Sequence, residues 1–153
     1  MNPPKKIIMK NHALILKTIL FISLVSISCT HEIPDPVQAQ KFVEDFMQKI
    51  SRNDFTNLSD HYSEEMHNGE SDEARIAKFE QLNQALGSAL SFTLLQQKSI
   101  QEPDSPPSVN FVYEVKHRKQ VVIEMYSVVK EGKAYKISKQ NTVSRSAWVD
   151  TTN

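Results

Sequence analysis

Apolar residues recur at steps of three and four in the middle of the chain, and at every second position in its last third. From Pro36 to Arg52 this spacing predicts an amphipathic helix that begins after Asp35 as its cap and ends near Arg52–Asn53. Pro36 suits the first helical position, because the N–H there would be unpaired in any case. The expected apolar stripe consists of Ala39, Phe42, Val43, Phe46, Met47 and Ile50.

Two more helices and a loop are expected before residue 88. A short helix is predicted over Phe55–Tyr62, with Asp54 as its cap and an inner side made of Phe55, Leu58 and Tyr62. The polar, acidic segment SEEMHNGE, residues 63–70, is expected to be a loop. Ser71 then caps a third helix, which Gly87 ends. Its apolar stripe is Ile76, Phe79, Leu82 and Leu86.

The rest of the chain is predicted to form an antiparallel sheet of four strands. The expected strands are Ser91–Gln101, Val109–Lys116, Gln120–Val129 and Tyr135 to about Ser144. Prolines in EPDSPP, residues 102–107, exclude a strand there, and KEGK, residues 130–133, is a hairpin turn in which Gly132 can adopt a positive φ. One face of the second strand carries Phe111, Tyr113 and Val115, and in the last strand Tyr135, Ile137 and Val143 alternate with polar residues. Helices followed by such a meander predict an α+β fold.

The N-terminus has the composition of an export signal. Four lysines and no acid precede a short apolar run, which is shorter than the roughly 20 residues that a membrane span needs. The segment SISC, residues 26–29, resembles the lipobox of bacterial lipoproteins, which implies cleavage before Cys29 and lipid on its thiol. Ser26 departs from that pattern, since a large aliphatic residue is usual there. The alternative is a free cysteine within a signal or membrane segment.

These observations divide the chain into four parts. We expect a signal peptide at 1–28, a lipidated cysteine and tether at 29–35, one domain at 36–146 and a tail at 147–153. Cys29 is the single cysteine, so no intramolecular disulfide can form. With Thr30 and His31 after the anchor, no aspartate retains the protein at an inner membrane. We therefore expect a periplasm-facing lipoprotein of the cell envelope, with the outer membrane favoured.

Charge and glycine content exclude several functions. The chain has 18 basic and 18 acidic residues, and removal of the four N-terminal lysines leaves 14 against 18, a net charge of −4. No dense Lys/Arg patch is present, so a nucleic-acid partner is not expected. Only 3 glycines occur, too few for a glycine-rich phosphate loop.

Three segments resemble the NTF2-like (cystatin-like cone) superfamily. They are NDFTNLSDHYSEEM at 53–66, ALG at 85–87 and VVIEMYSVVKEGKAYKISKQNTV at 121–143. The resemblance covers roughly residues 36–145. It implies that the helices pack into the concave side of a bent antiparallel sheet, and that a homodimer forms through the sheet. Because this superfamily contains enzymes, ligand binders and assembly modules, the fold does not decide the function.

Enzymes of that superfamily place a carboxylate, histidine or tyrosine inside the cone, and Asp60, His61 and Tyr62 are the candidates here. Consecutive helical residues point about 100° apart, so Tyr62 fits the apolar side and the other two fit the solvent. The simpler interpretation is a core tyrosine beside a solvated acid and imidazole. Histidines and acids between 61 and 72 lack the spacing of a ligand motif, so neither a metal nor a cofactor is expected.

Two further features could contact a partner. His117, Arg118 and Lys119 form a short basic cluster, expected at a solvated hairpin tip, where an acidic protein or a lipid head group could bind. Trp148 either packs back over the sheet or is an exposed contact for another protein.

The sequence thus leads to three functional hypotheses. The first is a noncatalytic, lipid-anchored envelope protein whose domain binds a partner protein or a small apolar ligand. The second is a small enzyme of the isomerase, dehydratase or hydrolase type, with an acid, histidine or tyrosine in the cone. The third is a structural subunit of an envelope assembly.

Overall fold

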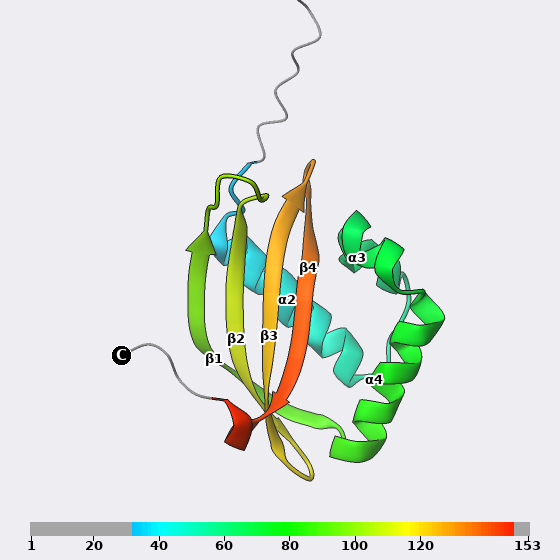
Figure 1. Cartoon of the computed structure of the whole chain (residues 1–153). Helices are drawn as coiled ribbons and strands as arrows, with labels where there is room; N and C mark the ends of the chain where they lie inside the picture. The colour runs from blue at the N-terminus through cyan, green and yellow to red at the C-terminus, as the bar shows by residue number, and fades with distance from the viewer. Residues whose placement is uncertain (1–31, 149–153) are drawn as a thin grey trace, which may run out of the picture. The chain divides into compact units, whose positions relative to one another are not determined.

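The computed structural model describes residues 32–148 and confirms the α+β prediction (Figure 1). The signal peptide and Cys29, and most of the predicted tail, lie outside the described residues. The elements are α2 (Pro36–Ser51), η1 (Leu58–His61), α3 (Glu64–Gly69), α4 (Asp72–Leu86), β1 (Ala89–Ile100), β2 (Ser108–His117), β3 (Val121–Glu131), β4 (Ala134–Ser144) and η2 (Arg145–Ala147). The strands form one open antiparallel sheet in the order β1-β2-β3-β4.

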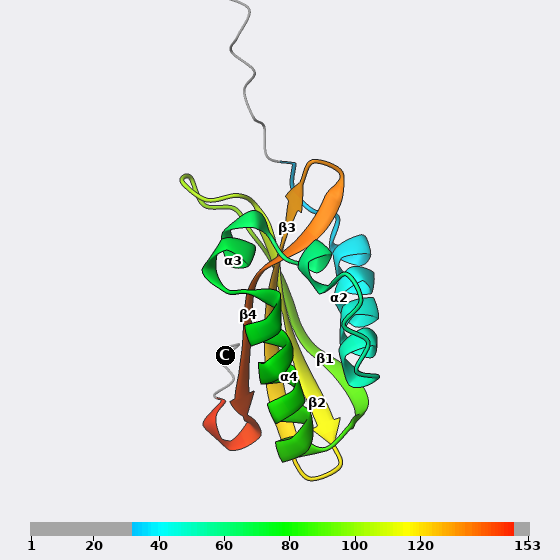
Figure 2. The same cartoon turned by 90° about the vertical axis from the view of Figure 1, so that its right-hand side faces the viewer.

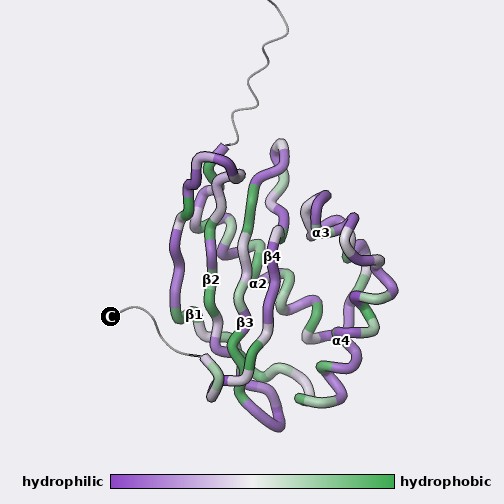
Figure 3. Tube along the Cα trace, in the orientation of Figure 1, coloured by the Kyte–Doolittle hydropathy of each residue, from purple (hydrophilic) through white to green (hydrophobic). Residues whose placement is uncertain are grey.

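Helix α2 covers one face of the sheet, and α4 runs beside the β4 edge (Figures 1 and 2). Asp35 caps α2 as predicted, accepting the Gln38 N–H at 2.9 Å. Phe46 of α2 lies at the centre of the core, with its ring centroid 6.2 Å from that of Phe79 on α4 and 6.1 Å from that of Tyr126 on β3. The inward rows of β2 and β3 supply the other half of this core, and these two strands carry most of the apolar colour in Figure 3. The core cluster draws on residues from Ala39 to Ile137, so the described part of the chain has a core of its own.

The chain already contacts the domain before residue 36. Pro34 is fully buried, and the Glu32 carboxylate pairs with Lys130 Nζ at 2.6 Å. Segment 32–35, assigned from the sequence to the tether, is therefore fixed to the β3–β4 end of the sheet.

The predicted helix over Phe55–Tyr62 is wrong. Asp54 caps a turn, with its Oδ1 accepting the Thr56 N–H at 3.1 Å, and Asn57 then adopts a left-handed conformation with φ 53°. Because a left-handed residue interrupts a right-handed helix, only the 3-10 helix Leu58–His61 forms.

The predicted loop over 63–70 is also wrong, because residues 64–69 form α3. Ser63 Oγ accepts the Met66 N–H at 3.3 Å, and Glu64 and Glu65 lie in the first turn, where the helix dipole favours acids. Ser63 also donates its own N–H to the Ile137 carbonyl at 2.9 Å, which joins α3 to β4.

Strand β4 does not keep the regular alternation expected for it. The register with β3 shifts after Ser127, which pairs with Lys139, while the next residue, Val128, pairs with Ile137. This β-bulge moves the following side chains to the opposite face. Val143 thus pairs with Ile123 on the outer face, and Gln140 and Thr142 face inward beside Tyr126 and Glu124.

Candidate functional site

A narrow pocket lies between α2, α4 and the concave face of the sheet. It has a volume of about 30 Å³, which is room for one water molecule or a small chemical group. Its walls are mostly apolar, from Met47, Ile50, Phe79, Leu82, Leu86, Ala89 and Phe92. Its polar lining comes from Ser51, Asn83, His117, Glu124, Tyr126, Gln140 and Thr142.

The polar lining centres on Glu124, a carboxylate in the middle of β3. Its Oε2 accepts the Tyr126 O–H at 2.5 Å, because residues two apart on a strand point to the same face. Burial, with the adjacent Glu124 charge adding to it, raises the pKa of Tyr126 well above its ordinary value. Tyr126 is therefore a neutral donor, and Glu124 keeps its second oxygen for another partner.

His117, the last residue of β2, faces that second oxygen. The side chain is buried, and its Nδ1 lies 2.8 Å from the Gly87 carbonyl, an acceptor, so Nδ1 carries a hydrogen and donates. Nε2 lies 3.9 Å from Glu124 Oε1, too far for a hydrogen bond, and has no other partner among the described residues. The Glu124 carboxylate raises the pKa of His117, the Gly87 carbonyl adds to this, and burial opposes it.

The β2–β3 hairpin fixes His117 in place by closing on the end of α4. Lys119 donates its N–H to the Leu86 carbonyl at 3.0 Å, and Arg118 donates to the Ser88 carbonyl at 3.2 Å. Gly87 lies between these bonds with φ 77° and ψ 174°. A Cβ there would lie 2.9 Å from Arg118 Cβ, so only glycine allows this close approach.

The three catalytic candidates from the sequence do not meet in this pocket. Asp60 is exposed, as expected. His61 is half-buried rather than solvated, with its ring 5.9 Å from that of Phe42. Tyr62 is buried, as expected, and reaches the pocket wall only indirectly, by donating its O–H to Gln140 Oε1 at 2.8 Å.

Tyr62 also has a cationic neighbour that the sequence did not indicate. The Arg75 guanidinium lies 4.0 Å above the ring of Tyr62, and burial raises the pKa of that phenol above its usual range. Arg75 is itself buried and donates to the Met66 carbonyl at 2.8 Å, so it links α4 to α3 and η1.

The three residues of the basic cluster do not share one environment in the structure. Arg118 and Lys119 are exposed, but the expectation that His117 is solvated is wrong, because its side chain points inward from the end of β2. Trp148 is half-buried, 5.0 Å from the Arg145 guanidinium, which in turn pairs with Glu114 on the outer face of the sheet at 2.9 Å.

Sequence reasoning missed Glu124 and Gln140 as pocket residues. The sequence did contain a signal for Glu124. It lies on the same strand face as Val122 and Tyr126, and an acid between such residues is unusual on an inward face. No such signal existed for Gln140, whose inward direction depends on the bulge after Ser127.

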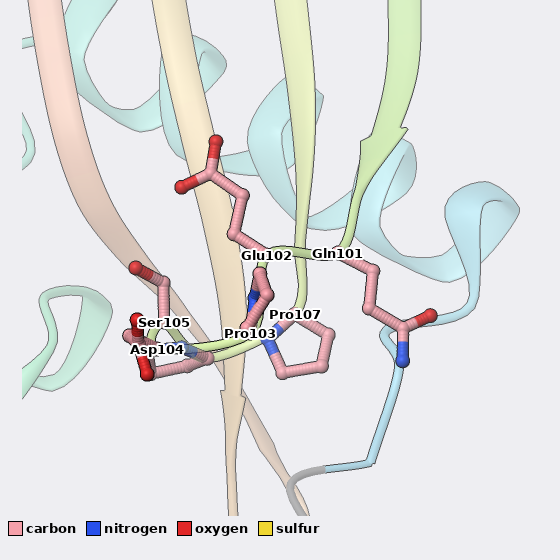
Figure 4. A pocket seen from close by; sticks show the side chains of 7 residues that line it. Gln101, Glu102, Pro103, Asp104, Ser105 and Pro107 are labelled. Atoms are coloured by element: carbon pink, nitrogen blue, oxygen red, sulfur yellow. The ribbon is translucent and has the colours of Figure 1, made fainter.

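Among the other hollows, two are larger and less enclosed. One, of about 640 Å³, is lined by loop 101–107 alone, in which the side chains of Gln101 and Glu102 point to different sides (Figure 4). The other, of about 370 Å³, includes Asn110 and Ser127 on the uncovered sheet face. Neither places a buried ionisable side chain next to an apolar wall, as the pocket at His117 does.

Within residues 32–148, no cluster of three or more histidine, cysteine or acidic side chains could hold a metal ion. No helix in the same range has the length and hydropathy to cross a membrane.

Comparisons with known proteins indicate the fold alone. No family model matches the chain, and no curated protein matches it. A solved structure of Bdellovibrio bacteriovorus Bd1075 is similar, with a TM-score of 0.50 and 19% sequence identity over 72% of this chain. The match spans 41% of the Bd1075 chain, so this protein corresponds to less than half of that one.

Proposed function

We propose that this chain is a noncatalytic, lipid-anchored envelope protein whose NTF2-like domain binds a small apolar ligand in the pocket at His117. One observation carries the proposal: His117 Nε2 is buried in an apolar-walled pocket without a hydrogen-bond partner among the described residues. Buried polar atoms nearly always have a partner, and an unmet one costs about 1–3 kcal/mol. A few converging polar groups within apolar walls are typical of small-molecule sites.

The position of the chain entry supports the anchored arrangement. Glu32 pairs with Lys130 next to the β3–β4 turn, whereas the β2–β3 hairpin lies at the opposite end of the sheet (Figure 1). His117 is the last residue of β2 before that hairpin. A lipid on Cys29, three residues before Glu32, would therefore hold the β3–β4 end near the membrane and leave the pocket end free. Such an arrangement would leave the pocket accessible to a ligand.

Native mass spectrometry of the full-length chain, extracted with detergent from its own membranes, tests the proposal. We expect a bound mass of metabolite or lipid size on the wild type. The control is Thr142→Phe, which places a ring in the pocket and is expected to carry no such mass. An equal bound mass on both proteins would contradict the pocket as the site. A wild type that is empty and also binds none of the probe compounds below would contradict ligand binding.

Acid–base catalysis in the same pocket is the second candidate. The observation that favours it is the grouping of Glu124 with the Tyr126 hydroxyl at 2.5 Å and the His117 imidazole at 3.9 Å, a carboxylate between two proton donors. If the bound compound is a substrate, Glu124→Gln should abolish its turnover while exposed Asp60→Asn should not. Recovery of the compound unchanged after incubation with the wild type would decide for binding alone.

A further inference from the structure

His117 Nε2 and Glu124 Oε1 line the same pocket and are close enough to bind one oxygen atom together. They are 3.9 Å apart, so an atom in the pocket beside the line that joins them can lie about 2.8 Å from each and complete two ordinary hydrogen bonds. The pocket volume of about 30 Å³ accommodates such an atom. His117 is only 8% exposed, so bulk water does not satisfy its Nε2.

The two sides of this position differ in hydrogen-bonding character. His117 uses the hydrogen on Nδ1 for the Gly87 carbonyl, so Nε2 is a donor in the protonated ring, the form that the Glu124 carboxylate 3.9 Å away favours. Glu124 offers an acceptor. The Tyr126 hydroxyl is already committed to the other carboxylate oxygen, so Oε1 is the acceptor that remains.

A hydroxyl is the ligand group that satisfies both sides, because it accepts one hydrogen bond and donates another. A ligand carboxylate can accept from His117 but would face the negative charge of Glu124. A ligand ammonium can donate to Glu124 but has no acceptor for the Nε2 hydrogen, and it would face a positive ring.

We propose, resting on the ligand-binding function above, that the pocket selects neutral apolar alcohols and holds the ligand hydroxyl between His117 Nε2 and Glu124 Oε1. The apolar part of such a ligand lies against the outer wall formed by Ile50, Leu82, Ala89 and Phe92. These four side chains line the same pocket and are only partly buried, so they have apolar surface left to cover. The small inner volume limits the buried end of the ligand to a single polar group.

Three probes with the same six-carbon chain test this selectivity: 1-hexanol, hexylamine and hexanoate. Each is titrated into the full-length chain in one detergent, labelled with ¹⁵N in its histidine rings and ¹³C in its methyl groups. We expect 1-hexanol to shift the His117 ring nitrogens and the Ile50 and Leu82 methyl groups, and to bind about tenfold more tightly than the other two. In Thr142→Phe, the blocked control, all three probes should lose these shifts.

Two variants test the proposed hydrogen bonds separately. In His117→Phe, which keeps an aromatic ring but removes the positive one, the preference for 1-hexanol over hexylamine should fall about tenfold. In Glu124→Gln, which removes the negative charge, the preference for 1-hexanol over hexanoate should fall about tenfold. Equal binding of all three probes by the wild type, or an unchanged preference in both variants, would overturn the selectivity and leave ligand binding intact. Failure of every probe to bind the wild type would overturn the selectivity, and with an empty native protein it would overturn ligand binding as well.

Discussion

Replacement of Gly87 by alanine tests the interlock between α4 and the β2–β3 hairpin. Gly87 has φ 77° and ψ 174°, a region that is almost exclusive to glycine. Forcing another residue into it costs about 1–3 kcal/mol. The added Cβ would also lie 2.9 Å from Arg118 Cβ, a separation that real Cβ atoms essentially never show. Relief of such overpacking typically costs about 1–3 kcal/mol more.

The two effects together predict a loss of about 2–6 kcal/mol in the free energy of unfolding. The other glycines of the chain provide matched controls. Gly132 has φ 61° with no atom near a new Cβ, so Gly132→Ala should show the backbone effect alone, about 1–2 kcal/mol. Gly69 lies at the end of α3 with open space around it, and Gly69→Ala should change stability by less than about 1 kcal/mol.

Urea unfolding of the full-length chain and its three variants, followed by circular dichroism, gives these values. The histidine ring spectrum adds a local measurement, because displacement of the Gly87 carbonyl removes the partner of His117 Nδ1. A Gly87→Ala variant that loses no more stability than Gly132→Ala would refute the close approach to Arg118. An unchanged His117 spectrum would show that the carbonyl position does not depend on Gly87.

Three further predictions concern other parts of the molecule. Since the folded-state pKa of His117 is raised, the contribution of this histidine to stability is fully present below the unfolded pKa of about 6.5 and is lost as pH rises through the folded pKa. The urea midpoint of the wild type should therefore fall over that pH range, and His117→Gln should reduce this fall. Parallel plots of urea midpoint against pH for the two proteins would contradict the prediction. Arg75→Met should lower the unfolding free energy by about 2–3 kcal/mol, because it leaves the Met66 carbonyl and the Tyr62 ring without their cation, and Arg75→Lys should recover part of the loss in the same unfolding assay. Cys29→Ser should leave the chain unprocessed or outside the detergent phase, and mature wild-type protein without acyl mass by mass spectrometry would refute the anchor.

The elements with strong periodic signals were predictable, and those that depend on single residues were not. Helix α2 carries a proline, a cap and six apolar residues at helical spacing, all of which favour the same structure. The segment after it depends on Asn57, whose left-handed conformation comes from its surroundings rather than from any periodic pattern. Helix α3 had the same signal as α4, a serine followed by acids, but its lack of an apolar stripe made it look like a loop.

The candidate site was less predictable than the fold, because it is formed by long-range contacts. The alternation along β3 is enough to predict that the Glu124 side chain points inward. Its closeness to His117, however, depends on the pairing of β2 with β3. The burial of His117 depends further on Gly87, which follows α4 and lies thirty residues earlier in the chain. The first relation spans a hairpin, so it follows from strand pairing rather than from periodicity along one strand, and the second lies outside any pattern of about ten residues.

The fold does not require polar side chains at this pocket, and this is the strongest reason to assign them a function. Taking a histidine and a glutamate out of water carries a desolvation cost, which their attraction at 3.9 Å offsets, since the pKa of His117 is raised. Apolar residues of similar volume at such sites are often neutral or stabilising, by about 1–4 kcal/mol. We therefore expect His117→Phe to lower the unfolding free energy by no more than about 1–2 kcal/mol, which is the contribution of the lost hydrogen bond from His117 Nδ1 to the Gly87 carbonyl. Retained stability with lost selectivity for 1-hexanol would separate the two roles, whereas a loss above about 4 kcal/mol, the size of a core cavity, would show that His117 serves chiefly to hold the fold.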